Sequence, residues 1–329
     1  WQRKNPTPQE TSRANFNDIL NLYGGSVSNN GDMSPRCESY REDVALANGL
    51  SNDSDRRKLY YNLRAACESG WDFSPRWMSD RRSLETTNTG YIYPVCLNSF
   101  LLRFEYNMCW LSKIIRGRTI SKEKQTQLAQ DYDFFREKAK LREIAIRKEL
   151  WNPGLNCWRD KWIKPESPFQ EMKGKDSKAV FFASDFFPLW AFSAKRDLDT
   201  DNDMLYTKEE FRALEMTLKT SGLLCKAGVR TSTNVSTGQQ WDSNAVWAPL
   251  VCIIVEGLIG AGITVLACNI AEKFIKTCAL GYERNQVIFE KYYWDGSGTR
   301  GGGGEYENQI GFGWSNGTVL RLVQLLTLP

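Results

Sequence analysis

The chain has 329 residues, with 43 Lys and Arg against 39 Asp and Glu, which gives a formal net charge of +4. It contains no histidine, which excludes a Ser-His-Asp triad, a Cys-His pair and a His-ligated zinc site. The charge is mild and Lys and Arg do not cluster in a run, so we expect no nucleic-acid partner.

Hydrophobic residues recur with the period of an α-helix along most of the chain. Ser121 and Thr207 are candidate N-caps, and Glu209 and Glu210 follow Thr207 in a first turn, where the helix dipole favours carboxylates. Long loops separate the helices, and such loops are usually functional. The pattern predicts one mostly α-helical domain whose chemistry lies on loops. The predicted helices cover residues 55–69, 97–115, 122–151, 208–221, 247–258, 265–281 and 318–326.

An apolar stretch runs from residue 250 to residue 268 and contains a single charged residue, Glu256. Its length nominally meets that of a membrane span. However, Gly257, Gly260 and Gly262 divide it, and an ionised glutamate near its middle would be costly in lipid. We therefore predict two buried helices joined by a glycine turn, and no membrane span.

The nine cysteines form no C-x-x-C pair, so neither a zinc ribbon nor a thioredoxin-like motif is present. A chain of this length does not need disulfides for stability, and the cysteines are spaced through predicted helices. This spacing favours small buried hydrophobic side chains over a disulfide framework.

The loop at residues 68–77 reads Glu-Ser-Gly-Trp-Asp-Phe-Ser-Pro-Arg-Trp and places Asp72 between Trp71 and Phe73. Aromatic neighbours can desolvate a carboxyl group, which raises its pKa and keeps a general acid protonated near neutral pH. A helix-capping role for Asp72 explains the local sequence equally well, and both interpretations stay open at this point.

A second loop holds four consecutive glycines, Gly301–Gly304, followed by Glu305. Successive glycines allow positive φ angles and close approach of a ligand. A phosphate-binding loop is the rival interpretation. The pattern lacks the Gly-Lys-Ser/Thr ending of such loops, and an acidic residue directly after the glycines would repel phosphate. Two carboxylates on separate loops with aromatic walls suit glycoside hydrolysis, although any carboxylate-rich protein could present such a pair.

Four motifs in sequence order resemble those of trehalases, glycoside hydrolase family 37, and the similarity is greatest to plant trehalases. A lesser similarity is found at Phe289–Tyr292. The resemblance implies an (α/α)6 toroid that hydrolyses α,α-trehalose to two glucose molecules with inversion, and without a metal or a cofactor. The motifs are Arg36–Tyr40, Glu68–Trp77, Trp241-Asp242 with Trp247-Ala248-Pro249, and the run Gly301–Gly317.

Carried over position by position, the resemblance implies that Asp72 is the general acid and Glu305 the general base. In an inverting enzyme the two carboxyl groups stand about 6.5–9.5 Å apart to admit the attacking water. Tryptophan faces would stack on the sugar rings, and a guanidinium and carboxylates would bind hydroxyl groups. For the residues of the third motif, a purely structural role in packing their own loop is a competing explanation. The implied substrate-binding residues are Arg36, Glu38, Trp71, Arg76, Gln240, Trp241, Asp242, Trp247, Gly303 and Gly304.

The chain also departs from the family pattern. The first signature of the family is missing, so the resemblance implies a single catalytic domain over residues 1–329 that is truncated at its N-terminus, with an incomplete toroid. Val246 stands where the family has a glycine, which would strain any positive φ that the glycine served. An alternative hypothesis is therefore a trehalase-like protein that binds sugar or a partner, or an enzyme fragment, without turnover.

The expected partner is a small molecule, the disaccharide trehalose, and the sequence does not predict an oligomeric state. The resemblance to plant trehalases favours a secretory, extracellular or cell-surface location, and a cytoplasmic location stays open. Sequons at Asn52, Asn234 and Asn316 are weak evidence for the secretory setting.

Overall fold

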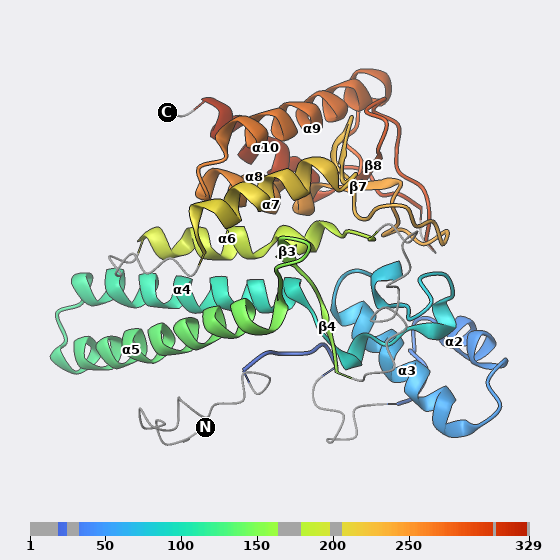
Figure 1. Ribbon diagram of the computed structural model, residues 1–329, viewed down its shortest axis with the longest axis horizontal. Coiled ribbons are helices and arrows are strands. Elements are labelled where there is room, and N and C mark those ends of the chain that lie inside the picture. The colour runs from blue at the N-terminus through green and yellow to red at the C-terminus, as the bar shows by residue number, and fades with distance from the viewer. Residues whose placement is uncertain (1–18, 25–32, 164–178, 198–205, 305–306, 328–329) are drawn as a thin grey trace.

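Helices make up most of the chain that the computed structural model describes, which comprises residues 19–24, 33–163, 179–197, 206–304 and 307–327. In Figure 1 the helices lie in stacked layers, with short two-stranded ribbons beside them. Within the described residues they do not close into a ring. This arrangement agrees with the mostly α-helical, incomplete fold expected from the sequence.

Two helices of 24 residues form an antiparallel hairpin at one side of the layers (Figure 1). They are α4 (Val95–Arg118) and α5 (Lys122–Ala145). The Oγ atom of Ser121 accepts a hydrogen bond from the Lys124 amide, as expected for the predicted N-cap. The predicted helix at residues 122–151 is confirmed to residue 150, with its last five residues in a π-helical turn before a strand begins.

The apolar stretch at residues 250–268 belongs to two packed helices, α8 (Ala248–Gly260) and α9 (Thr264–Asn285). The turn between them contains Gly262, whose φ of +80° suits glycine. The prediction of two helices joined by a glycine turn is confirmed. Their burial is confirmed only for α8, because α9 buries one face and leaves Val265 88% exposed. No helix in the described part of the chain is both long enough and apolar enough to cross a membrane.

A short helix, α6 (Pro188–Ser193), connects the hairpin layer to α8, since it packs against both α4 and α8. Gly257 allows this contact, because a Cβ atom there would lie 2.8 Å from the Trp190 amide nitrogen. Glu256 accepts hydrogen bonds from Trp190 Nε1 at 2.8 Å and from Arg321 Nε at 2.6 Å. The one carboxylate of the apolar stretch therefore joins three helices.

Four further helices belong to the described part of the chain. Thr207 forms a capping box with Glu210, which confirms its predicted role as an N-cap. The shortest helices, α2 and α6, were not among the predicted ones. The remaining helices are α2 (Tyr40–Ala47), α3 (Asp53–Glu68), α7 (Lys208–Thr220) and α10 (Gly313–Thr327).

Four antiparallel ribbons of two short strands each hold the loops together. In the ribbon nearest the candidate site, Trp247 pairs with Lys291 and Val246 pairs with Tyr292. Val246 does not adopt a positive φ, so the strain considered for this position is absent. The ribbons are β1 (Ile92–Tyr93) with β4 (Lys161–Trp162), β2 (Trp151–Asn152) with β3 (Cys157–Trp158), β5 (Leu224–Cys225) with β6 (Gly228–Val229), and β7 (Ala245–Trp247) with β8 (Lys291–Tyr293).

All nine cysteines are free thiols, as their spacing through helices predicted. Burial raises the pKa of several of these thiols; for Cys109 it reaches about 11, which keeps the thiol protonated and unreactive. Five of the cysteines act as small side chains in the core, as expected, whereas Cys37 is exposed and Cys67, Cys252 and Cys268 are partly buried. The buried ones are Cys96, Cys109, Cys157, Cys225 and Cys278.

Candidate active site

The Asp72 loop leaves the C-terminus of α3 and turns at once into the protein. The hydroxyl of Ser69 accepts a hydrogen bond from the Trp71 amide at 3.0 Å, and Gly70 adopts a φ of +72°. A 3₁₀ helix at 75–77 follows, and its N-cap is Ser74, which binds the Arg76 amide. The helix-capping interpretation of Asp72 is therefore wrong, since Ser74 takes that role.

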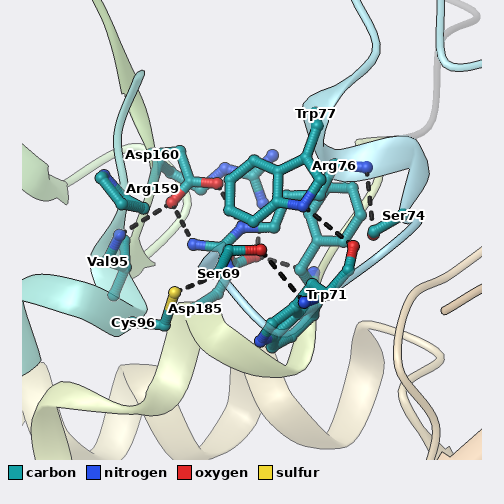
Figure 2. Close-up of polar contacts among 12 residues, drawn as sticks. Ser69, Trp71, Ser74, Arg76, Trp77, Val95, Cys96, Arg159, Asp160 and Asp185 are labelled. Atoms are coloured by element: carbon teal, nitrogen blue, oxygen red, sulfur yellow. Dashed lines mark hydrogen bonds and ion pairs between the residues drawn. The ribbon is translucent and has the colours of Figure 1, made fainter. Parts of the chain in front are cut away.

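Arg76 anchors this loop from behind through a buried ion pair (Figure 2). Its Nε and Nη2 atoms donate to the two carboxylate oxygens of Asp160 at 2.5 and 2.6 Å, and its Nη1 atom donates to Cys96 Sγ at 3.1 Å. The guanidinium lies 4.8 Å from the ring of Trp71 and 4.4 Å from that of Trp77. Arg76 thus packs against the indole next to Asp72, a cation–π contact that fixes the ring.

The partner of Arg76 is held in its charged form. Burial would raise the pKa of Asp160, but the positive charge and hydrogen bonds of Arg76 hold it below its usual range. The Val95 amide, at the start of α4, also donates to Asp160 at 2.8 Å. The ion pair therefore links the Asp72 loop to the N-terminus of α4.

Stacked tryptophans form one wall of the site. Trp71 stacks on Trp241 with ring centroids 5.0 Å apart, and Trp241 stacks on Trp247 at 4.0 Å with an angle of 6° between the ring planes. Trp314 meets Trp247 edge-on at 5.5 Å. Such aromatic contacts stabilise the wall beyond the area that they bury. The residues come from the loop after α3, the loop before β7, β7 itself and α10.

Asp242 holds the loop before β7 in shape. Its carboxylate accepts hydrogen bonds from the Thr237 amide at 2.5 Å, the Thr237 hydroxyl at 2.8 Å and the Gly238 amide at 2.9 Å. Burial raises the pKa of Asp242 above its ordinary value, and these hydrogen bonds oppose the rise. Both oxygens are thus engaged by the protein's own loop.

The glycine-rich segment lies against this loop. The Gly304 amide donates to the Gly238 carbonyl at 3.1 Å, and Gly303 and Gly304 have φ angles of +88° and +84°. A Cβ atom would lie 2.9 Å from the Gln239 carbonyl oxygen at Gly303, and 2.8 Å from Gln240 Cβ at Gly304. Both backbone conformation and space therefore require glycine here.

Gly304→Ala is expected to lower the free energy of unfolding by about 1–3 kcal/mol, because the new side chain is strained and meets Gln240. Urea unfolding would measure the change. Gly302→Ala is the matched control, since no atom lies within 4 Å of a Cβ there and its φ is not positive. Equal losses for the two variants would contradict the close packing inferred at Gly304.

Parts of these segments line an open cavity of about 340 Å³. Four residues that the resemblance implied for the site line it together: Asp72, Gln240, Trp241 and Trp247. Asp72 is half-buried there, and its backbone carbonyl accepts a hydrogen bond from Gln240 Nε2. The full lining consists of Gly70, Asp72, Gln240, Trp241, Trp247, Glu290, Glu307, Gln309 and Trp314.

Five of these lining residues were not singled out from the sequence: Gly70, which lies in the Glu68–Trp77 motif, and Glu290, Glu307, Gln309 and Trp314. Gln309 and Trp314 belong to the glycine-rich motif itself, and Glu290 lies in the weaker similarity at Phe289–Tyr292, so both signals could have found them. Glu307 carried no such signal, because the family motif leaves its position open.

Other implied residues lie outside this lining. Arg36 is buried in an ion pair with Asp43 at 2.7 Å, with its guanidinium 5.1 Å from the ring of Phe73. Glu38 is exposed just before α2. Trp71 stacks behind Trp241, Arg76 binds Asp160, and Asp242 binds its own loop. Gly303 and Gly304 pack on the loop of Gln240.

Glu305, the implied general base, lies outside the described residues. Gly304, directly before it in the chain, packs beside the cavity-lining residue Gln240. In the part of the chain that the structure describes, no cluster of three or more His, Cys, Asp or Glu side chains could hold a metal ion.

Comparison with known proteins connects this chain to one family. The family model described as "Trehalase" matches residues 6–327. The "Probable trehalase" of Oryza sativa subsp. japonica is 37% identical over 90% of this chain and 50% of that protein. The "Trehalase" of Arabidopsis thaliana is 34% identical over 88% and 44%, respectively. The "Periplasmic trehalase" of Escherichia coli O1:K1 / APEC is 33% identical over 94% and 49%.

The chain therefore spans about half the length of the curated relatives that it matches. Among solved structures, the neutral trehalase Nth1 from Saccharomyces cerevisiae aligns with a TM-score of 0.57 and 20% identity, over 88% of this chain and 46% of that one. The GH63 mannosylglycerate hydrolase from Thermus thermophilus, in complex with glucose, aligns with a TM-score of 0.52 and 16% identity, over 90% and 76%. At these identities the two structures establish a similarity of fold alone.

Proposed function

The chain belongs to the trehalase family, and on that premise we propose that it hydrolyses α,α-trehalose to two glucose molecules by an inverting mechanism with two carboxyl groups. Asp72 is the general acid of this proposal and Glu305 the general base. Its main structural support is that Asp72 lines a cavity of about 340 Å³ together with the stacked Trp241 and Trp247. A cavity of this size suits a small ligand.

The aromatic wall and the polar lining suit a sugar for separate reasons. The C–H faces of a pyranose ring are apolar and pack on indole rings, whereas its hydroxyl groups need hydrogen-bond partners. Trp314 is the partly exposed indole of the lining. Trp241 and Trp247 are only 3% and 1% exposed, because their rings contact one another, Trp71 and Lys291, and they support the pocket from behind. Glu290, Glu307 and Gln309 supply such partners around the same cavity. The lining thus offers apolar contacts for the ring faces of a disaccharide and hydrogen-bond partners for its hydroxyl groups.

The two carboxyl groups and one water molecule account for every proton and bond in the proposed reaction. Protonated Asp72 donates its proton to the glycosidic oxygen while the bond from that oxygen to the anomeric carbon breaks. Glu305 takes a proton from a water molecule, whose oxygen attacks the anomeric carbon from the opposite face. One glucose leaves with its α configuration, and the other is released as the β anomer. Asp72 ends ionised and Glu305 protonated, and exchange with solvent restores both.

Proton NMR of the fresh products tests the proposal. Trehalose should give α- and β-glucose in equal amounts before mutarotation, because only one of the two sugars is inverted. The α anomer alone would contradict inversion. Calorimetric binding of trehalose without glucose release would instead favour the alternative, a protein that binds the sugar without turnover, and the half-length match to the relatives makes this control necessary.

A further inference from the structure

Lys291 is a buried lysine that contacts two residues of the cavity lining, Gln240 and Trp247, without lining the cavity itself. It begins β8, opposite Trp247 in the ribbon, and only 1% of its surface is exposed. Burying an ammonium group is costly unless polar partners compensate for the lost water. The partners of Lys291 therefore indicate what it does.

The ammonium of Lys291 contacts three separate segments. Its Nζ atom donates to Gln240 Oε1 at 3.0 Å and to the Gly303 carbonyl at 3.3 Å. It also lies 4.7 Å from the centre of the Trp247 ring, where a cation is attracted by the π electrons. A lysine ammonium has three donors in different directions, so it can serve these partners simultaneously.

Gln240 extends this connection to Asp72. Its side-chain Nε2 donates to the Asp72 carbonyl while its Oε1 accepts from Lys291. A continuous path of hydrogen bonds thus runs from the backbone of Asp72 through Gln240 and Lys291 to Gly303. Gly303 stands two positions before Glu305 in the sequence.

The charge on Lys291 is sensitive to its surroundings. Burial lowers the pKa of Lys291, and the negative charge of Glu290, together with that of Asp72 whenever Asp72 is ionised, opposes this effect. The charged form donates the stronger hydrogen bonds to the two carbonyl oxygens and is the form that the Trp247 ring attracts.

We propose that Lys291 is a positioning residue that fixes the spacing between the Asp72 loop and the glycine-rich segment that leads to Glu305. The inference rests on the proposed function, in which the two carboxyl groups must admit one water between them. Lys291 acts through Gln240 and Gly303 and need not touch the substrate. Without its ammonium, the two segments lose their shared partner.

The test compares Lys291→Met, which keeps most of the side-chain volume without the charge, with Lys291→Arg, which keeps the charge. We expect Lys291→Met to lower kcat for trehalose by about 100-fold with KM within about threefold, because misplacement of reacting groups acts on the chemical step. Lys291→Arg keeps a charged group with several N–H donors and should recover at least about tenfold of that loss. Equal kcat values for both variants, or an unchanged kcat in Lys291→Met, would overturn the proposal. Lys276→Met, on the exposed face of α9, is the control.

Gln240→Met removes the hydrogen bonds of the Gln240 side chain to Lys291 and to the Asp72 carbonyl. It therefore tests the positioning role even if Lys291→Met does not fold. Its kcat should fall as in Lys291→Met, and the double variant should lose less than about threefold more than either single one, because both changes remove one link. If the loss of kcat in the double variant equals the product of the losses in the two single variants, the two residues do not act through one path.

Hydrogen exchange separates this inference from the proposed function. The Gly304 amide is bound to the Gly238 carbonyl, and in Lys291→Met it should exchange at least about tenfold faster than in the unchanged chain, with Lys291→Arg close to the latter. If the unchanged chain releases no glucose, the proposed function fails, while the exchange rates still decide whether Lys291 holds the glycine-rich segment. Unchanged exchange in Lys291→Met would overturn the positioning role.

Discussion

Replacing Asp72 with Asn is expected to lower kcat for trehalose by about 10³-fold, because Asn keeps the shape of the side chain but cannot donate the proton of a general acid. The leaving group of trehalose is a sugar hydroxyl, which departs poorly as an alkoxide. Glucose release over time measures the effect. Circular dichroism and the thermal midpoint should stay close to those of the unchanged chain.

A substrate with a better leaving group sharpens this prediction. α-D-Glucopyranosyl fluoride loses fluoride without needing a proton, so Asp72→Asn should retain much of its rate on this substrate while Glu305→Gln should not. Asp53→Asn is the matched control, since Asp53 is exposed in the first turn of α3 and lies outside the cavity lining. Full activity of Asp72→Asn on trehalose would refute the assignment of the acid.

The largest effect on stability is expected from Asp160→Asn. This change removes the counter-charge of Arg76, a residue with 1% exposure, and leaves its guanidinium buried between Trp71 and Trp77. Breaking a buried ion pair from one side costs about 3–5 kcal/mol of unfolding free energy. Urea unfolding followed by tryptophan fluorescence would measure the loss.

The double variant Arg76→Met with Asp160→Asn checks the cause. If the loss comes from an unpaired buried charge, removing that charge as well should restore part of the stability. Asp53→Asn breaks the exposed pair of Asp53 with Arg57 and should cost no more than about 1 kcal/mol. A double variant that is no more stable than Asp160→Asn alone would show that the charge is not the cause.

The sequence predicted the helices because their signals are local. The first-turn carboxylates after Thr207, the N-cap at Ser121 and the glycines between α8 and α9 each act within a few residues of the chain. The predicted helix over residues 122–151 matches a helical run that ends at residue 150, but its change from an α- to a π-helical turn at residue 146 was not predicted, because periodic apolar residues continue through that turn.

The site was harder to predict, because its residues are selected by contacts across the chain. Asp72, Gln240, Trp241 and Trp247 line the cavity as the family motifs implied, but Arg36, Arg76 and Asp242 have their polar atoms bound to other protein groups. No local pattern distinguishes a motif carboxylate that faces a ligand from one that holds its own loop. The partners of Lys291, which lie 51 and 12 positions away in sequence, are equally invisible to periodicity.

The stack of Trp71, Trp241 and Trp247 also has an optical consequence. Their indole planes are nearly parallel and their centroids are 4.0 and 5.0 Å apart, so their electronic transitions couple and contribute a shared signal to the near-ultraviolet circular dichroism. Trp241 and Trp247 face the cavity, and any occupant that tilts either ring alters that coupling. A change in the near-ultraviolet circular dichroism would therefore report a rearrangement of these tryptophans without an added dye.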